Sequence, residues 1–326
     1  MQRNPEIDFG IISDGEIPFA QLLKNLNHPE KVSNLVFRRN GKIQFTDRQM
    51  ENFNSIPFPA RELFDMRPYQ MKRYAISVQS KRGCGFNCIF CPNEFLVGKT
   101  YRLRSPKKVV DEIEHLVNNY DIDCYFFVDS TFNHPYEHSR RICQELIARK
   151  LYVDWSAEFT PNFLNKESLK EAVKSGCKFF FFSPDGASDM ALKILGKDFQ
   201  VQHIEKTISI AREVEGANVG YNFMYDLPDY NSEHKAGLVR LVTKMIFELR
   251  QKLYLISLTK MRIYPHTKLQ EIAVKEGKLS QGSNLLFPHY YSDTSSLGYE
   301  NVIPELLRKS TSFFDVVTRK SRKHDF

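Results

Sequence analysis

Apolar, strand-like runs alternate with helical stretches from Tyr74 to Gly277, and this alternation constrains the fold of the chain more than any other feature. The apolar runs are YAISVQ, CYFFVD, YVDWSAEF, CKFFFFS, NVGYNFM and YLISLTKM. Apolar residues at helical spacing predict helices at 106–119, 137–149, 166–175, 189–213 and 232–251, and the segment HTKLQEIAVKEG predicts a sixth that ends at the glycine. Strands that alternate with helices in this way form parallel βα units.

Six such units are too few for the eight-fold barrel, which leaves a partial barrel or an open doubly wound sheet. We expect an α/β fold: a partial (β/α)6 TIM-like barrel over residues 73–278. Residues 1–72 are expected to form a small N-terminal α/β appendage, with a hairpin that turns at Asn40-Gly41 and a proline-rich linker. Residues 279–326 are expected to form a C-terminal extension with a basic tail. Barrels and doubly wound sheets both bind ligands at the C-terminal ends of their strands.

The composition excludes several classes of protein. A formal charge of +7 over 326 residues is too moderate for a dedicated nucleic-acid binder, and no apolar run is long enough to span a bilayer. The first residues lack the basic-then-apolar pattern of a signal peptide. We therefore expect a cytoplasmic protein that binds neither nucleic acid nor membrane. Clustered cysteines in that compartment bind metal more often than they form disulfides.

Three of the six cysteines lie within eight residues, in the loop that directly follows the first barrel strand. Cys84, Cys88 and Cys91 have the spacing C-x3-C-x2-C. Their thiolates can converge on one metal centre, and soft thiolates select zinc or an iron–sulfur cluster. Structural zinc needs four ligands, whereas this loop supplies three. An iron–sulfur cluster on three cysteines leaves one iron open, which indicates catalysis. The other cysteines are predicted to pack as small hydrophobes: Cys124, Cys143 and Cys177.

On these residues the chain resembles the radical S-adenosylmethionine (SAM) superfamily. The C-x3-C-x2-C spacing, the aromatic Phe90 before the last cysteine and the six βα units match the signature and the partial barrel of that family. The resemblance implies a [4Fe–4S] cluster on Cys84, Cys88 and Cys91, whose open iron binds SAM. It also implies reductive cleavage of SAM to a 5′-deoxyadenosyl radical, which takes hydrogen from a small-molecule, biosynthetic substrate. A flavodoxin- or ferredoxin-like protein would donate the electron.

The resemblance also suggests which residues contact SAM. Asp129 and Ser130, after the second strand, match the position that binds the SAM amino group, and a carboxylate suits an ammonium. Asp185 matches the family's ribose-binding glutamate, although it is one methylene shorter. Lys197 matches a lysine that would pair with the SAM carboxylate, and Phe90 would pack beside the adenine. The alternatives are a turn cap for the Asp-Ser pair and a solvent-exposed lysine.

Three further residues are expected at the same mouth of the barrel if strand alternation holds. They are Asn222 on the fifth strand, and Arg262 and Tyr264 on the sixth. The family lines the adenine with its sixth-strand segment. For each of these side chains the alternative is packing in the core or on the surface. The sequence assigns no catalytic residue.

The chain resembles most closely the branch of the family that carries a cobalamin-binding domain before the barrel. DFGIISDGEIPFAQLLKNL resembles the end of that domain, IPFPAREL the linker, and MRIYPHTKLQEIAVKEG the segment after the sixth strand. The remainder of the domain and its D-x-H-x-x-G motif do not occur here. We therefore expect an enzyme without cobalamin in this chain. The alternatives are a methyltransferase that uses cobalamin held by a separate protein, and a metal-binding scaffold without catalysis.

Overall fold

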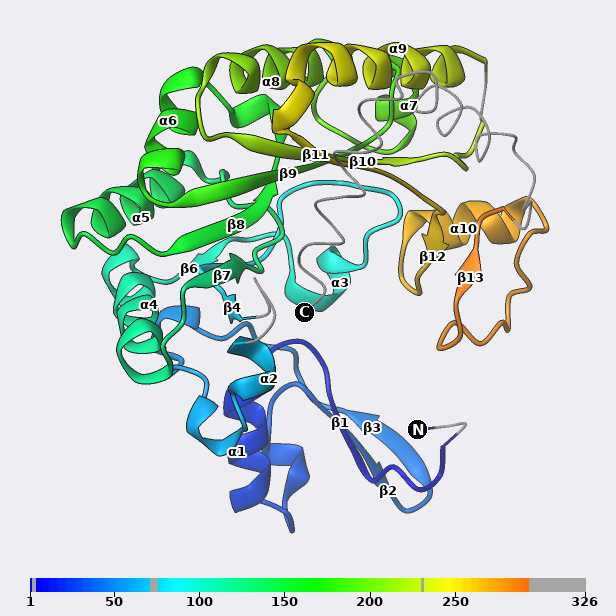
Figure 1. The fold of residues 1–326 in the computed structure, drawn as a ribbon. Coiled ribbons are helices and arrows are strands. Elements are labelled where there is room, and N and C mark those ends of the chain that lie inside the picture. The colour runs from blue at the N-terminus through cyan, green and yellow to red at the C-terminus, as the bar shows by residue number, and fades with distance from the viewer. Residues whose placement is uncertain (2–3, 71–75, 230–231, 293–326) are drawn as a thin grey trace. The chain divides into compact units, whose positions relative to one another are not determined.

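The computed structural model describes residues 1, 4–70, 76–229 and 232–292 (Figure 1). The chain divides into two compact units. The first consists of Met1–Asn87 and Cys91–Trp155, and the second of Cys88–Phe90 and Ser156–Phe326. The predicted boundary at 72/73 and the basic tail lie outside the described residues. No helix in the described ranges is both long and apolar enough to cross a bilayer.

Six strands form the main sheet, in the spatial order β11-β10-β9-β8-β7-β4. Their bounds are β4 Ser77–Val78, β7 Cys124–Phe127, β8 Asp154–Phe159, β9 Cys177–Asp185, β10 Asn218–Met224 and β11 Leu253–Thr259. β4 pairs parallel with β7, and β10 pairs parallel with β9 and with β11. The spatial order follows the chain order, whereas a doubly wound sheet reverses direction at a switch point. This order supports the predicted partial-barrel arrangement over the doubly wound alternative.

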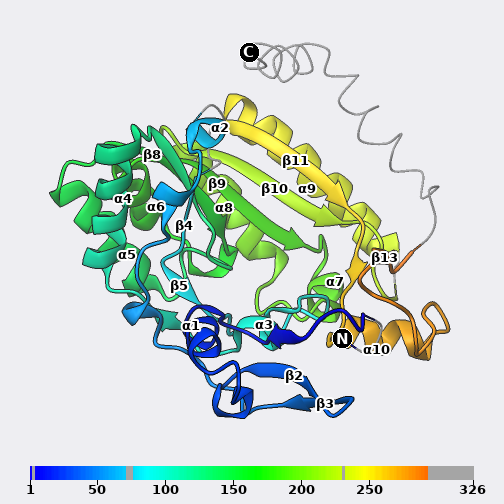
Figure 2. The same ribbon diagram turned by 90° about the horizontal axis from the view of Figure 1, so that it is seen from below.

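In the second unit, three helices cover one face of β9–β11: α6 (Lys166–Lys174), α8 (Val201–Glu213) and α9 (Ser232–Leu249) (Figures 1 and 2). Tyr221 of β10 belongs to this covered face, because its hydroxyl lies 2.8 Å from that of Thr207 on α8 and its ring stacks on Phe182. Phe179 points to the other face, where its ring lies 4.5 Å from that of Tyr254. Strand alternation thus separates a helix-covered face from an open face.

The first unit has its own aromatic core and two packed helices, α4 (Pro106–Tyr120) and α5 (Tyr136–Ala148). The ring of buried Trp155 lies 5.3 Å from that of Phe127 and 4.8 Å from that of Phe132. Three short elements surround the cysteine loop: β5 (Lys81–Arg82), α3 (Asn93–Val97) and β6 (Arg102–Leu103). β5 and β6 pair antiparallel.

The N-terminal residues of this unit form a three-stranded antiparallel sheet and helix α1 (Glu16–Lys24). The strands are β1 (Phe9–Ile11), β2 (Leu35–Arg39) and β3 (Lys42–Phe45), and a short helix α2 (Arg67–Gln70) follows. Asn40 and Gly41 have φ angles of 51° and 73°, and this pair of positive values confirms the predicted type I′ hairpin turn. Leu22 of α1 packs against Val32, Leu35 and Phe37 in a small separate core.

Two predictions about the second unit are wrong. The helix expected at 189–213 is two helices, α7 (Asp189–Ile194) and α8, because Gly196 adopts a φ of 74° and ends α7. Arg262 and Tyr264 do not lie on the sixth strand, which ends at Thr259. Arg262 instead belongs to β12 (Arg262–Ile263), which pairs antiparallel with β13 (His289–Tyr290) away from the main sheet.

The final predicted helix is present as α10 (Lys268–Lys275). Thr267 caps its N-terminus by accepting a hydrogen bond from the Gln270 backbone N–H. Gly277 follows its C-cap with a φ of 72°, which confirms the predicted left-handed glycine at this position.

Candidate functional site

The cysteine loop begins with a very close backbone approach. A Cβ atom at Gly83, which has a φ of 93°, would lie 2.1 Å from the Thr100 carbonyl oxygen. The Cys84 backbone N–H donates to the Gly98 carbonyl at 3.0 Å. Only glycine fits at position 83, and the loop therefore returns onto the residues just before β6.

Residues 88–90, in the middle of the cysteine motif, belong to the second unit. The Ile89 backbone N–H donates to the Leu195 carbonyl at 3.0 Å, and the Ile89 carbonyl accepts from the Leu269 N–H at 2.8 Å. Ile89 is buried in the core that also contains these two leucines. The backbone between Cys88 and Cys91 is thus fixed by α7 and α10, although no sequence motif marks those contacts.

The chemistry of the three cysteines suits an iron–sulfur cluster. Cys84 is buried, and Cys88 and Cys91 are half-buried; thiolates are soft ligands of the kind that iron–sulfur clusters select. Over the described ranges, no three His, Cys, Asp or Glu side chains are grouped as ligands of a metal ion. The ligand role of the three cysteines stays a prediction, based on their spacing and their chemistry.

Asp129 is fully engaged by the residues that precede the cysteine loop. One of its carboxylate oxygens accepts from the backbone N–H groups of Ser80 and Lys81, at 2.8 and 3.2 Å. The other accepts from the Ser80 hydroxyl at 2.5 Å and from the Lys81 ammonium at 3.0 Å. The side chains of Lys81 and Asp129 are 1% and 0% exposed. Burial lowers the pKa of Lys81, and its ion pair with Asp129 opposes that shift.

Through these contacts Asp129 has a structural role: it links the end of β7 to the residues that precede the cysteine loop. Its predicted contact with the SAM amino group is not tested by this arrangement and stays a prediction. Ser130 is exposed, and its hydroxyl accepts a hydrogen bond from the Asn93 side chain at 3.1 Å. The sequence analysis missed Ser80 and Lys81, although a lysine directly after a buried strand was a visible signal.

Three predicted SAM-binding residues meet at the ends of β9 and β10. The Lys197 ammonium donates to Asp185 Oδ2 at 2.5 Å, and the Asn222 amide donates to Oδ1 at 3.3 Å. Asp185 has a φ of 63° and follows a register shift in the pairing of β9 with β10. Tyr221 pairs with Phe182 and Phe223 pairs with Asp185, so β9 has one more residue than β10 between the two pairs. This extra residue in β9 is a bulge, a device that re-aims side chains next to functional sites.

Burial sets the electrostatics of this group. It raises the pKa of Asp185, while the Lys197 ammonium and the Asn222 amide oppose that shift. The Lys197 nitrogen also lies 5.4 Å from the centre of the Phe90 ring. Phe90, Asp185, Lys197 and Asn222 therefore form one connected group inside the second unit. Lys197 lies in the break between α7 and α8, and from there its ammonium reaches the Asp185 carboxylate.

Arg262 and Tyr264 form a separate pair. The Arg262 guanidinium lies 4.7 Å from the centre of the Tyr264 ring, and both residues are half-buried. Neither makes a hydrogen bond or ion pair with the Asp185 group within the described residues. Their predicted contact with adenine stays a prediction.

His234 of α9 supports the turn that follows Asp185, and the sequence analysis missed it. Its Nδ1 accepts from the Ala187 N–H at 3.2 Å, and its Nε2 donates to the Met224 carbonyl at 3.1 Å. Burial lowers the pKa of this imidazole. Three residues along the helix, a Cβ at Gly237 would lie 2.0 Å from the Ala187 carbonyl oxygen. A glycine inside a predicted helix was the signal that another backbone approaches there.

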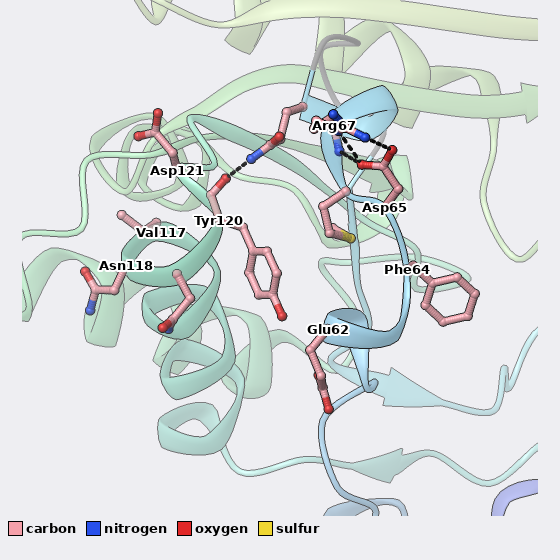
Figure 3. Close-up of a pocket in the computed structure, with 11 residues that line it drawn as sticks. Glu62, Phe64, Asp65, Arg67, Val117, Asn118, Tyr120 and Asp121 are labelled. Atoms are coloured by element: carbon pink, nitrogen blue, oxygen red, sulfur yellow. Dashed lines mark hydrogen bonds and ion pairs between the residues drawn. The ribbon is translucent and has the colours of Figure 1, made fainter.

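A groove of about 510 Å³ in the first unit is lined by none of the predicted site residues (Figure 3). It is formed by residues 62–70 and by the C-terminal end of α4, with Asp121. Two of the charged groups that line it pair with each other, since the Arg67 guanidinium donates to both oxygens of the Asp65 carboxylate. The Gln70 amide donates to the Tyr120 carbonyl.

The model of the family "Radical SAM superfamily" matches residues 65–242, which is more than half of the chain. The chain belongs to the radical SAM superfamily. This membership confirms the predicted family and shows that the chain is an enzyme. The cofactors that the family implies are a [4Fe–4S] cluster and SAM, the two that the cysteine loop predicts.

Relatives of this radical SAM chain are longer proteins. The chain is 26% identical over 285 residues to an uncharacterized methyltransferase of Pyrococcus horikoshii, a match that spans 86% of this chain and 61% of the relative. It is 33% identical over 138 residues to an anaerobic magnesium-protoporphyrin IX monomethyl ester cyclase of Cereibacter sphaeroides, which spans 41% of this chain and 22% of the relative.

Solved structures confirm the fold. The methyltransferase TsrM of Kitasatospora setae, determined with cobalamin and a [4Fe–4S] cluster, superposes with a TM-score of 0.71 at 16% identity, over 83% of this chain and 56% of TsrM. The cobalamin-dependent enzyme OxsB, with aqua-cobalamin and SAM bound, gives a TM-score of 0.67 at 13% identity, over 90% of this chain and 49% of OxsB. This chain thus spans about half to three fifths of the length of these proteins.

Proposed function

We propose that this enzyme cleaves SAM reductively and uses the resulting 5′-deoxyadenosyl radical to take hydrogen from a small organic substrate of biosynthesis. The observation that carries the proposal is the three-thiol loop after the first barrel strand, closed by Gly83 and held through Ile89. A [4Fe–4S] cluster on Cys84, Cys88 and Cys91 would supply the electron for the cleavage.

The Asp185 group offers a binding surface for the rest of SAM. The carboxylate of Asp185 is an acceptor for ribose hydroxyls, and the Lys197 ammonium would pair with the SAM carboxylate. Phe90, half-buried beside Lys197, presents an aromatic face for the adenine. Asp129 and Ser130 would receive the amino group. Each of these roles is part of the proposal.

The test is anaerobic reconstitution with iron and sulfide, followed by dithionite and SAM. The product to measure is 5′-deoxyadenosine. Cys88→Ala should abolish its release and the iron–sulfur absorbance, because two thiolates cannot replace three. The matched control is Cys143→Ala, which removes a buried thiol from α5 and should keep both signals. Absence of a cluster in the unaltered chain, or undiminished release by Cys88→Ala, would refute the proposal.

A second candidate is methyl transfer with cobalamin held by a separate cobalamin-domain protein. The Pyrococcus relative is named a methyltransferase, and TsrM is a methyltransferase with cobalamin bound. Methyl transfer from SAM produces S-adenosylhomocysteine, so its appearance with cobalamin, in place of 5′-deoxyadenosine, would favour this candidate. A third candidate, a non-catalytic scaffold, would be favoured by zinc without iron after anaerobic purification.

We also propose that the electron comes from a flavodoxin- or ferredoxin-like protein in the cytoplasm. The net charge of +7 favours encounter with an acidic partner. Such an encounter weakens with salt because the charges are screened. Reduction by flavodoxin should therefore slow as ionic strength rises, and a rate independent of salt would contradict this partner.

A further inference from the structure

Glu158 lies next to the Asp185 group and has no role in the function proposed above. It belongs to β8, and one of its carboxylate oxygens, Oε2, accepts a hydrogen bond from the Ser183 hydroxyl of β9 at 3.1 Å. The Lys197 ammonium donates to the backbone carbonyl of the same Ser183 at 3.0 Å. Ser183 therefore links Glu158 to Lys197, and Lys197 in turn pairs with Asp185.

The charges of this region do not balance. Lys197 and Asp185 neutralise each other at 2.5 Å, with both side chains less than a tenth exposed. Glu158 has no cation within ion-pair distance among the described residues, and its second oxygen has no hydrogen-bond donor there. The Glu158 side chain is half-buried. Burial raises the pKa of Glu158, and the hydrogen bond from Ser183 opposes that shift. A cation bound beside this half-buried carboxyl would favour its charged form and would be attracted more strongly than in water.

The same face of the sheet carries aromatic side chains. Phe181 lies two residues before Ser183, so it points to the same side about 7 Å further down the strand. Its ring centre is 6.2 Å from that of Tyr254, which is 54% exposed. Phe181 pairs with Gly220 of the neighbouring strand β10, and a Cβ at Gly220 would lie 2.8 Å from the Phe181 ring, so glycine leaves the space that this ring occupies. Ser183, which holds the Glu158 carboxyl, thus shares one face of β9 with Phe181, and the aromatic surface on that face continues to the exposed Tyr254.

We propose that Glu158 binds a cationic group of a small organic ligand whose apolar part covers Phe181 and Tyr254. This inference rests on the proposed function, because it names the chemical class of a molecule that the same barrel face would hold. Two sources share the chemistry. One is an amine substrate, and the other is SAM itself, which carries an ammonium and a sulfonium.

Calorimetry on the reconstituted full chain tests the inference with three probes: phenethylamine, its neutral counterpart 2-phenylethanol, and SAM. The unaltered chain should bind phenethylamine at least about tenfold more tightly than the alcohol, since a charged hydrogen bond adds about that much. Glu158→Gln keeps the size and the contact with Ser183 but removes the charge, so it should erase this preference. The control Glu167→Gln removes a charge from the exposed part of α6 and should leave the preference intact.

The outcomes separate the two sources. Loss of the amine preference in Glu158→Gln assigns the cation to a substrate, and a roughly tenfold loss of SAM affinity in that variant assigns it to SAM. Two results together would overturn the inference. The unaltered chain would bind the amine and the alcohol equally or not at all, and Glu158→Gln would bind SAM with unchanged affinity. Amine binding needs no turnover, so its failure is distinguishable from failure to release 5′-deoxyadenosine.

Discussion

His138 is the residue in this chain whose ionisation couples most clearly to the fold. It lies on α5, and burial together with the nearby Lys81 ammonium lowers its pKa from 6.5 to about 4, although Asp129 opposes that shift. The imidazole is therefore neutral in the folded chain at neutral pH. Protonating it would place a second positive charge beside the buried ion pair of Lys81 and Asp129.

The sign of the effect follows from proton binding. Between pH 6.5 and pH 4 the unfolded chain binds a proton at His138 and the folded chain does not, so the free energy of unfolding falls as the pH is lowered through this range. The full contribution is about 3 kcal/mol. In His138→Gln this component should be absent, as measured by urea unfolding at pH 7 and at pH 4.5. The exposed His28→Gln is the control, and equal pH slopes for both variants would contradict the prediction.

At the scale of elements, the packing of α9 onto the turn after β9 is the contact that most directly shapes the Asp185 group. His234 and Gly237 both meet Ala187, two residues after the aspartate. The turn itself is tight, since a Cβ at Gly186 would lie 3.1 Å from the Leu192 backbone nitrogen. A small shift of α9 is therefore expected to move the carboxylate of Asp185.

Gly237→Ala tests this coupling. Alanine is the better helix former by about 1 kcal/mol, but its Cβ would lie 2.0 Å from the Ala187 carbonyl oxygen. We expect net destabilisation of about 1–3 kcal/mol, typical of overpacking, together with weaker SAM binding. Gly282→Ala is the control, because nothing lies within 4 Å of a Cβ there. A Gly237→Ala variant that is more stable in urea than the parent would refute the close contact.

At the scale of the whole molecule, Asp14 joins the N-terminal residues to the strands around the cysteine loop, all within the first unit. Its carboxylate accepts from Arg82 of β5 at 3.0 Å and also from Arg102 of β6. The Asp14 side chain is 3% exposed, and both guanidinium groups are largely buried. Asp14, in the turn between β1 and α1, thus links this turn to both β5 and β6.

Asp14→Asn should leave both guanidinium groups without their buried counter-charge, at a cost of about 3 kcal/mol. The expected result is a lower urea midpoint and faster proteolytic cleavage among residues 1–70. Glu16→Gln is the matched control. Glu16 also pairs with Arg82 but is 40% exposed, so its loss should cost less than about 1 kcal/mol. Equal stability losses for the two variants would show that burial of Asp14 is not what matters.

The sequence by itself determined the elements and the family. Periodicity located most helices and strands of the second unit, although it merged α7 and α8 into one helix. Local backbone preference predicted the Asn40-Gly41 turn and the glycine that ends α10. The C-x3-C-x2-C spacing indicated the family because its ligands lie within one loop.

Only the tertiary structure decided which residues meet. It ended α7 at Gly196 and so brought Lys197 to Asp185, it removed Arg262 from the sixth strand, and it placed Glu158 beside Ser183. None of these contacts follows from periodicity, because each joins residues of separate elements. Their meeting depends on strand register and on the β9 bulge, which are set by packing of the whole sheet.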